Sequence, residues 1–220
     1  MAQLDYRLNP IVDAGALPGA DLPALAREAA LGGATLIQYR DKQASTRLMV
    51  ERATAIRVAL AGTGVPFVVN DRLDVALASG ADGVHLGRDD MRPEEARRLC
   101  RPAAIIGLTV KNEADARAAA AAPIDYACVG GVFATLSKDN PDPPVGLEGL
   151  SRLVAIIRES RPDLPVGAIA GIELAQVPQV IAAGADGVAA ISAIFETGDP
   201  RTAAQAFRAT VDEALKGRGS

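Results

Sequence analysis

Aromatic side chains are scarce in this chain of 220 residues: they make up 3% of it, and tryptophan is absent. Because hydrophobic residues still account for 49%, the core must be built from Ala, Val, Ile and Leu, which is typical of buried parallel strands covered by helices. One histidine and two cysteines, Cys100 and Cys128, leave little scope for an imidazole or thiolate metal site. We interpret both cysteines as reduced thiols in the core.

The chain also lacks an excess of positive charge and any long apolar run. Its net charge of −4 provides no long-range attraction to nucleic acid or to an anionic membrane, so an anion site must be a local basic pocket. Nothing in Met1–Pro10 resembles a signal peptide, and no apolar run is long enough to cross a bilayer. We therefore expect a cytoplasmic protein that binds neither nucleic acid nor membrane.

Apolar runs typical of strands alternate with amphipathic helical segments along nearly the whole chain. The predicted strands are Leu8–Asp13, Thr35–Arg40, Pro66–Asn70, Gly83–Leu86, Ala104–Leu108, Tyr126–Gly130, Val166–Ala170 and Gly187–Ile191. Eight strands with right-handed helical crossovers close into a (β/α)8 TIM barrel, and the length fits one such domain over residues 1–220. The alternative, an open doubly wound sheet, requires a glycine-rich dinucleotide turn after the first strand, which is missing here.

A short motif recurs between a predicted helix and the strand that follows it. Its copies are Gly32-Gly33-Ala34-Thr35, Gly80-Ala81-Asp82-Gly83 and Gly184-Ala185-Asp186-Gly187. We interpret a glycine in each copy as the residue that ends the helix in a left-handed turn. The motif then has a structural role and lies at the end of the barrel opposite the expected active site.

The run from Gln38 to Lys42 closes the second predicted strand with polar side chains. Side chains alternate along a strand, so Gln38, Arg40 and Lys42 share one face, and Tyr39 and Asp41 share the other. Two cations at one strand end repel each other and are costly to bury without a partner. An anion with several oxygens, such as a diphosphate, would relieve that cost.

Other predicted strands also end in polar residues, as a TIM-barrel active site requires. These residues are Asn70-Asp71, His85 with Asp90, Thr109 with Lys111, the group Thr135, Ser137 and Lys138, Gly171, and Ile191-Ser192. Separated carboxylates at Asp71 and Asp90 suit Mg²⁺, which prefers a few carboxylates plus water and phosphate oxygens. The late strand ends suit a monophosphate held by backbone N–H groups.

These motifs, in this order, resemble the thiamine phosphate synthase family. The resemblance extends from Ile37 to Ile194 and rests on Gln38-x-Arg40-x-Lys42, Val69-Asn70-Asp71, Gly83-Val84-His85-Leu86-Gly87 with Asp90, Gly107-Leu108-Thr109, Thr135-x-Ser137-Lys138, Ala170-Gly171-Ile172 and Ala185-Asp186-Gly187 with Ile191-Ser192. It implies a transferase in which 4-amino-2-methyl-5-hydroxymethylpyrimidine diphosphate loses pyrophosphate. The ring nitrogen of 4-methyl-5-(2-phosphoethyl)thiazole then captures the methylene carbon to give thiamine phosphate.

The resemblance also implies a role for each matching residue. The diphosphate contacts would come from Arg40, Lys42, Asn70 and Lys138, with Mg²⁺ bridged by Asp71 and Asp90. The pyrimidine would meet Gln38 and the Gly171 backbone, and Thr109 would face the diphosphate or the reacting carbon. The thiazole phosphate would bind Thr135, Ser137 and the Ile191-Ser192 amides. The expected catalytic residues are Arg40, Lys42, Thr109 and Lys138.

One position in the expected site has a second interpretation, and two others differ from the residues that are usual in the family. His85, the single histidine, is expected to be a packed strand-end residue, because the implied chemistry needs no imidazole base. Many relatives carry two glycines where this chain has Ala170-Gly171, so Ala170 is expected to narrow the pyrimidine pocket. Thr109 stands where serine is common.

Two other functions compete with the synthase. A thiazole tautomerase of the same superfamily needs a proton shuttle; the resemblance implies a histidine after the fifth strand, where this chain has Lys111. A non-catalytic barrel could bind a phosphorylated metabolite, although decay would not preserve the full set of cations and carboxylates. A homo-oligomer is compatible with the sequence, and no heptad pattern indicates a protein partner.

Overall fold

The computed structural model describes residues 4–134 and 143–218 and contains a closed barrel of eight parallel strands in sequence order. Each strand pairs with the next, and β8 pairs with β1. The strands are β1 (Leu8–Asp13), β2 (Ile37–Arg40), β3 (Phe67–Asn70), β4 (Gly83–Leu86), β5 (Ile105–Val110), β6 (Tyr126–Val129), β7 (Val166–Ala168) and β8 (Gly187–Ala190). The predicted TIM barrel is confirmed.

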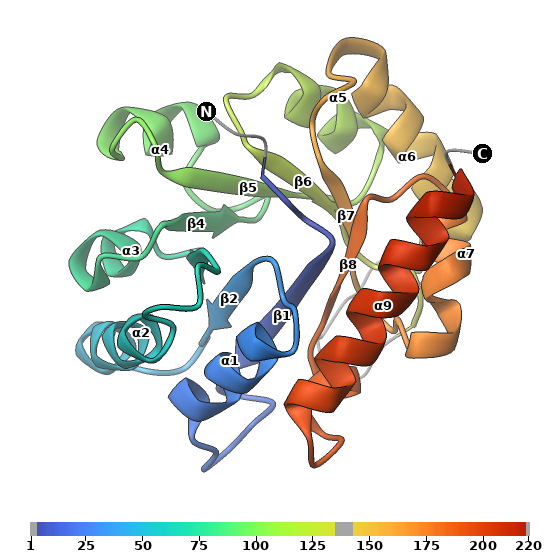
Figure 1. The fold of residues 1–220 in the computed structure, drawn as a ribbon. Helices are drawn as coiled ribbons and strands as arrows, with labels where there is room; N and C mark the ends of the chain where they lie inside the picture. The colour runs from blue at the N-terminus through green and yellow to red at the C-terminus, as the bar shows by residue number, and fades with distance from the viewer. Residues whose placement is uncertain (1–3, 135–142, 219–220) are drawn as a thin grey trace.

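Helices follow the strands and surround the barrel (Figure 1). They are α1 (Leu22–Leu31), α2 (Thr46–Ala59), α3 (Leu73–Ser79), α4 (Pro93–Leu99), α5 (Glu113–Ala121), α6 (Gly146–Ser160), the 3₁₀ turn η1 (Leu174–Gln176), α7 (Val177–Ala182), α8 (Ser192–Phe195) and α9 (Pro200–Arg218). The last helix packs against both α1 and α7 and so closes the outer ring. None of the helices in the described ranges is long and apolar enough to cross a membrane.

Every predicted strand coincides with an observed one, and only the ends differ. The seventh strand ends at Ala168, before the predicted end at Ala170, because Ala170 and Gly171 both take positive φ angles. Such angles leave the extended conformation that a strand needs. The fifth strand continues to Val110, past the predicted end at Leu108.

The repeated helix-to-strand motif is structural, but its aspartates matter as much as its glycines. The carboxylate of Asp82 accepts the backbone N–H of Phe67 at 2.9 Å, and that of Asp186 accepts the N–H of Val166 at 2.9 Å. Asp125, outside the predicted motif, accepts the N–H of Ile106 at 2.8 Å. Each carboxylate therefore binds the first residues of the preceding strand and satisfies an N–H that the sheet leaves unpaired.

In each copy of the motif one glycine takes the positive φ angle that the prediction requires. Gly80 ends α3 with a left-handed φ of 72°, as predicted, and Gly184 has a φ of 111°. At the end of α1, however, Gly32 remains right-handed, and Gly33 takes the positive φ of 102°. Gly32 instead lies against the backbone of Arg201 and the methyl group of Ala204 in α9, where a side chain would not fit.

Two of the few aromatic residues fill the barrel interior. The rings of Tyr6 and Tyr126 have their centroids 4.7 Å apart, and they pack with Leu36, Val68 and Cys128. Glycines provide the room: a methyl group at Gly107 would overlap the Tyr126 ring, and one at Gly167 would overlap the Tyr6 ring. A large ring opposite a missing side chain keeps the interior tightly packed.

Candidate active site at the carboxyl ends of the strands

The side chains of β2 alternate as the sequence predicts. Tyr39 belongs to the hydrophobic core between the barrel and the helices, and its hydroxyl donates to Asp41 at 3.0 Å. Gln38 and Arg40 lie on the opposite face of the strand, toward the barrel interior. Gln38 is only 2% exposed.

Arg40 is held by a carboxylate that the sequence analysis missed. Its guanidinium forms an ion pair with Asp13, the residue next to it in the register of β1 and β2. The same carboxylate accepts the backbone N–H groups of Gly15 at 2.9 Å and Ala16 at 3.2 Å. Asp13 thus fixes both the loop after β1 and the position of Arg40. The sequence could have indicated Asp13 as a site residue, because it is the last residue of the first predicted strand.

The structure brings Lys42, Asp71 and Asp90 together from three different loops. Lys42 forms an ion pair with Asp71, and the Asp90 carboxyl group lies beside that of Asp71 and interacts with it. Asp90 also accepts the backbone N–H of Gly87 at 2.6 Å. Two carboxylates and one ammonium group therefore meet where the strand ends of β2, β3 and β4 converge.

The two carboxyl groups differ in acidity because their surroundings differ. Burial and the neighbouring Asp71 carboxylate raise the pKa of Asp90. Burial also acts on Asp71, but the interactions with Asp90 and Lys42 outweigh it and lower the pKa of Asp71. The two neighbouring carboxylates repel each other, and a bound divalent cation would offset this repulsion.

The backbone at the end of β3 presents Asp71 to this group. Asp71 has a φ of 64°, in the left-handed region that aspartate tolerates better than most residues. Its N–H donates to the carbonyl of His85 at 2.7 Å. Asn70, the last residue of β3, is 9% exposed and lies beside His85 in the register of β3 and β4.

Thr109 and His85 are joined by a hydrogen bond of 2.8 Å between Oγ1 and Nε2. The other ring nitrogen of His85, Nδ1, lies 2.9 Å from the hydroxyl oxygen of Tyr126. His85 is buried, in agreement with its prediction as a packed strand-end residue, but it forms one link of a polar chain. Tyr126 was not predicted to take part.

The loops after β6 and β7 extend the pairing of those strands. Val132 donates to the carbonyl of Ile169 at 3.1 Å, and Phe133 donates to that of Ala170 at 3.0 Å. Gly171 has a φ of 63°, and a side chain there would overlap the carbonyl of Ala134. Ala170 has a φ of 92°, so this residue carries backbone strain where a glycine would carry none.

The remaining predicted residues lie later in the chain. Ile191 and Ser192 are half-buried at the start of α8, after β8. Thr135, Ser137 and Lys138 lie outside the described residues.

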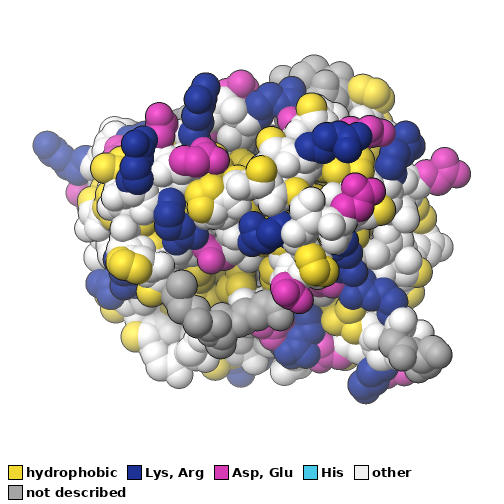
Figure 2. Space-filling model, turned by 90° about the horizontal axis from the view of Figure 1, so that it is seen from above, with side chains coloured by type: hydrophobic (Ala, Val, Ile, Leu, Met, Phe, Trp, Pro, Cys, Tyr) yellow, Lys and Arg dark blue, Asp and Glu magenta, His cyan; other side chains and the backbone are white. Residues whose placement is uncertain are grey.

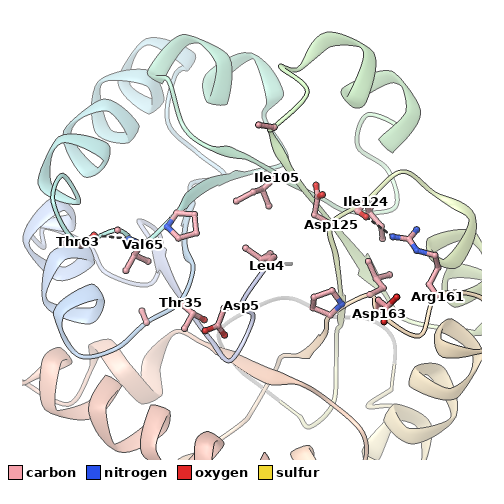
Figure 3. Close-up of a pocket in the computed structure, with 16 residues that line it drawn as sticks. Leu4, Asp5, Thr35, Thr63, Val65, Ile105, Ile124, Asp125, Arg161 and Asp163 are labelled. Carbon is pink, nitrogen blue, oxygen red and sulfur yellow. Dashed lines mark hydrogen bonds between the residues drawn. The ribbon is translucent and has the colours of Figure 1, made fainter. Parts of the chain in front are cut away.

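A cavity of about 600 Å³ lies at the other end of the barrel (Figure 3). Its lining includes Leu4 at the centre of the view, Thr35, Val65, Ile105 and Asp125, which belong to the amino ends of the strands. Catalysis in TIM barrels takes place at the carboxyl ends. We therefore place the active site at the carboxyl end, despite the size of this cavity.

Charge of both signs is mixed on the side of the molecule seen in Figure 2. Lysine and arginine side chains alternate there with aspartate and glutamate, and no large patch of one sign is visible on this face. The cations of the candidate site are, by contrast, matched to specific carboxylates: Arg40 to Asp13 and Lys42 to Asp71.

The composition of the site suits a polyphosphate with a bound cation. In residues 4–134 and 143–218 no group of three or more His, Cys, Asp or Glu side chains could hold a metal ion. A pair of carboxylates therefore needs further oxygen ligands, which Mg²⁺ takes from phosphate and water. Cations beside the carboxylates would bind the rest of a phosphate group.

Comparison with known proteins gives one consistent family. Residues 8–194 match the family model described as thiamine monophosphate synthase. The chain is 63% identical over 218 residues to the thiamine-phosphate synthase of Agrobacterium fabrum, covering 99% of each chain. It is 42% identical over 208 residues to the thiamine-phosphate synthase of Chloroflexus aurantiacus, covering 94% of each.

A solved structure agrees with these relatives. The thiamine phosphate pyrophosphorylase from Pyrococcus furiosus superposes with a TM-score of 0.84 at 38% identity, over 96% of this chain and 98% of that one. A 3-hexulose-6-phosphate synthase superposes with a TM-score of 0.61 at 20% identity and shows the fold alone.

Proposed function

This chain belongs to the thiamine monophosphate synthase family, and we propose that the cluster of Lys42, Asp71 and Asp90 is the centre at which it forms thiamine phosphate. The enzyme is a transferase of thiamine biosynthesis. Its substrates are the pyrimidine diphosphate and the thiazole phosphate, and its products are thiamine phosphate and pyrophosphate. The observation that carries this assignment is the meeting of Lys42, Asp71 and Asp90: Lys42 pairs with Asp71, and the Asp90 carboxyl group lies beside that of Asp71.

The residues at the cluster suit the binding of Mg²⁺ together with a diphosphate. Asp71 and Asp90 would hold the ion, which supplies positive charge to the diphosphate oxygens and favours their departure. The raised pKa of Asp90, caused by burial and by Asp71, supports this assignment, because a bound cation would offset the repulsion between the two carboxylates.

The surrounding side chains orient the diphosphate. Arg40 contributes a guanidinium whose position is fixed by Asp13, so its remaining N–H groups keep a defined direction. Lys42 and Asn70 add further donors, and Lys138 supplies another cation. Their common task is to stabilise the negative charge that grows on the leaving group.

The main contribution of the protein to the reaction between the pyrimidine and the thiazole is to position the two rings. An aminopyrimidine delocalises the positive charge that forms on its methylene carbon when pyrophosphate leaves, so no protein nucleophile is required. Gln38 and the Gly171 backbone contact the pyrimidine, and Thr109 faces the diphosphate or the reacting carbon. Thr135, Ser137, Ile191 and Ser192 hold the thiazole phosphate so that its ring nitrogen meets that carbon.

The test is an assay with the purified protein, both substrates and Mg²⁺, in which thiamine phosphate is measured by fluorescence after oxidation. Product formation that requires both substrates and stops with EDTA supports the synthase. Absence of product from a folded protein would contradict it and favour the tautomerase or a binding barrel without catalysis.

Variants test the residue assignments separately from the reaction. Arg40→Ala and Lys138→Ala should each lower kcat by roughly 10²–10³-fold while the protein stays folded. Asp90→Asn should raise the Mg²⁺ concentration needed for half-maximal rate, because one carboxylate ligand is lost. Lys216→Ala, in an exposed ion pair on α9, is the matched control and should leave the rate unchanged; a near-normal kcat in the first two variants would contradict their roles.

The substrates indicate the cellular location and the partners of the enzyme. Both are small phosphorylated molecules, and we place the reaction in the cytoplasm, without nucleic acid or membrane as a partner. A homo-oligomer is compatible with this assignment.

A further inference from the structure

A continuous polar chain runs from the barrel interior to the candidate active site. The Tyr126 hydroxyl lies 2.9 Å from His85 Nδ1, and His85 Nε2 lies 2.8 Å from Thr109 Oγ1. Tyr126 and His85 are buried, whereas Thr109 is only half-buried at the carboxyl end of β5. The polar chain thus connects a residue deep in the barrel to one at the carboxyl end of β5, where the candidate active site lies.

The register of the sheet explains how Tyr126 reaches His85. In neighbouring strands His85 lies beside Gly107, and Gly107 lies beside Tyr126. A methyl group at Gly107 would overlap the phenol ring. The missing side chain therefore lets Tyr126 extend across β5, and the ring is supported from the other side by Tyr6.

The hydrogen bonds of this chain have one favoured direction. Burial raises the pKa of Tyr126 well above its usual value, so the hydroxyl keeps its proton. A buried phenol proton needs an acceptor, and among the described residues the acceptor is His85 Nδ1. A ring nitrogen that accepts a hydrogen bond carries no proton, so the imidazole proton of His85 is on Nε2, which donates to Thr109 Oγ1.

We propose that Tyr126 is a positioning residue: its hydroxyl fixes the tautomer of His85, which in turn orients the Thr109 hydroxyl so that its own hydrogen points into the active site. Thr109 accepts from His85 and is thereby left to donate to an oxygen of the bound diphosphate. No proton is transferred along the chain. This inference rests on the proposed function, in which Thr109 faces the diphosphate. It adds the direction of the hydrogen bond that the Thr109 hydroxyl forms there.

The single histidine makes this tautomer directly measurable. With ¹⁵N-labelled protein, NMR of the imidazole nitrogens reports His85 alone, because the sequence contains no other histidine. At neutral pH the wild-type enzyme should show the Nε2–H tautomer. Tyr126→Phe, which keeps the ring and removes the hydroxyl, should shift His85 toward the Nδ1–H tautomer.

Thr109→Val tests the direction of the hydrogen bonds in the polar chain and leaves Tyr126, in the barrel interior, unchanged. If Tyr126 sets the tautomer, this variant keeps His85 as Nε2–H. If Thr109 were the donor to Nε2, the same variant would release His85 from the Nδ1–H form. An Nδ1–H signal in the wild type, or an unchanged signal in Tyr126→Phe, overturns the proposal.

Kinetics then test the consequence for catalysis. Tyr126→Phe should lower kcat by about tenfold without raising the KM of either substrate, because the oriented hydroxyl acts on the departing diphosphate. In a Thr109→Val background the same substitution should have no further effect on kcat, since the group that it orients is gone. Equal effects in both backgrounds would overturn the positioning role.

A neighbouring tyrosine provides the matched control. Tyr6→Phe also removes a buried hydroxyl from the barrel interior, but that hydroxyl binds Asn9 at 3.1 Å. It should leave both the His85 signals and kcat unchanged. The NMR signals decide the direction of the chain even in a protein without synthase activity, so failure of this inference is distinguishable from failure of the proposed function.

Discussion

Asp41→Asn is expected to destabilise the protein by about 2–3 kcal/mol at neutral pH. The Asp41 side chain is only 4% exposed, in the loop that joins β2 to α2 and carries Lys42. Its carboxylate accepts the N–H groups of Gln43 and Ala44 at 3.0 Å each, the Tyr39 hydroxyl at 3.0 Å and the Arg52 guanidinium at 2.6 Å.

The magnitude follows from the contacts that asparagine keeps and loses. The amide oxygen can still accept the two backbone N–H groups, but the amide nitrogen is a donor and cannot accept from Tyr39 or Arg52. The lost hydrogen bond from Tyr39 to a charged group contributes about 1.5 kcal/mol or more. The Arg52 ion pair adds at most about 1 kcal/mol, because the Arg52 side chain is 38% exposed and is screened by solvent.

The effect should also depend on pH in a defined direction. Burial raises the pKa of Asp41, but the N–H groups of Ala44 and Gln43 together with Tyr39 and Arg52 outweigh it, so the pKa in the folded protein is lowered. The stabilisation is then present above the pKa of the unfolded chain, about 3.9, and is lost as the pH falls through the folded value. The difference between wild type and Asp41→Asn should therefore shrink below about pH 4.

Urea denaturation at pH 7 and near pH 3.5, followed by circular dichroism, measures both effects. The control is Asp74→Asn, because Asp74 also pairs with an arginine but its side chain is 58% exposed; its cost should stay below about 1 kcal/mol. An Asp41→Asn variant as stable as the wild type at pH 7, or a difference that does not change with pH, would refute this reasoning.

Two further substitutions test the backbone of the barrel. Ala170→Gly should stabilise the protein by about 0.5–1 kcal/mol in urea denaturation, because relief of strain at a φ of 92° exceeds the added entropy of the unfolded chain; a lower midpoint would contradict this. Gly107→Ala should cost about 3 kcal/mol, since its methyl group would overlap the Tyr126 ring. Gly217→Ala, with no atom near its added methyl group, is the control, and equal midpoints for the two alanine variants would show that the Tyr126 ring can move aside.

The sequence predicted the polar residues at the strand ends and the pairing of Asp71 with Asp90, but it did not predict which carboxylate holds Arg40. The alternation of Gln38, Tyr39, Arg40 and Asp41 follows from strand geometry alone. Asp13 was missed because its partner Arg40 lies on the next strand, and only the register of β1 and β2 brings the two side chains together. A polar residue at the end of a predicted strand is a signal that applies to the first strand as well as to the later ones.

The sequence by itself determined the order of strands and helices, the closed barrel and the end at which the polar residues gather, because periodicity and strand ends are local properties. Tertiary structure alone decided which further residues meet them. The ion pair of Arg40 with Asp13 and the reach of Tyr126 across Gly107 to His85 depend on the stagger between strands. That stagger is set by packing of the whole barrel, since each strand is fixed by both of its neighbours at once.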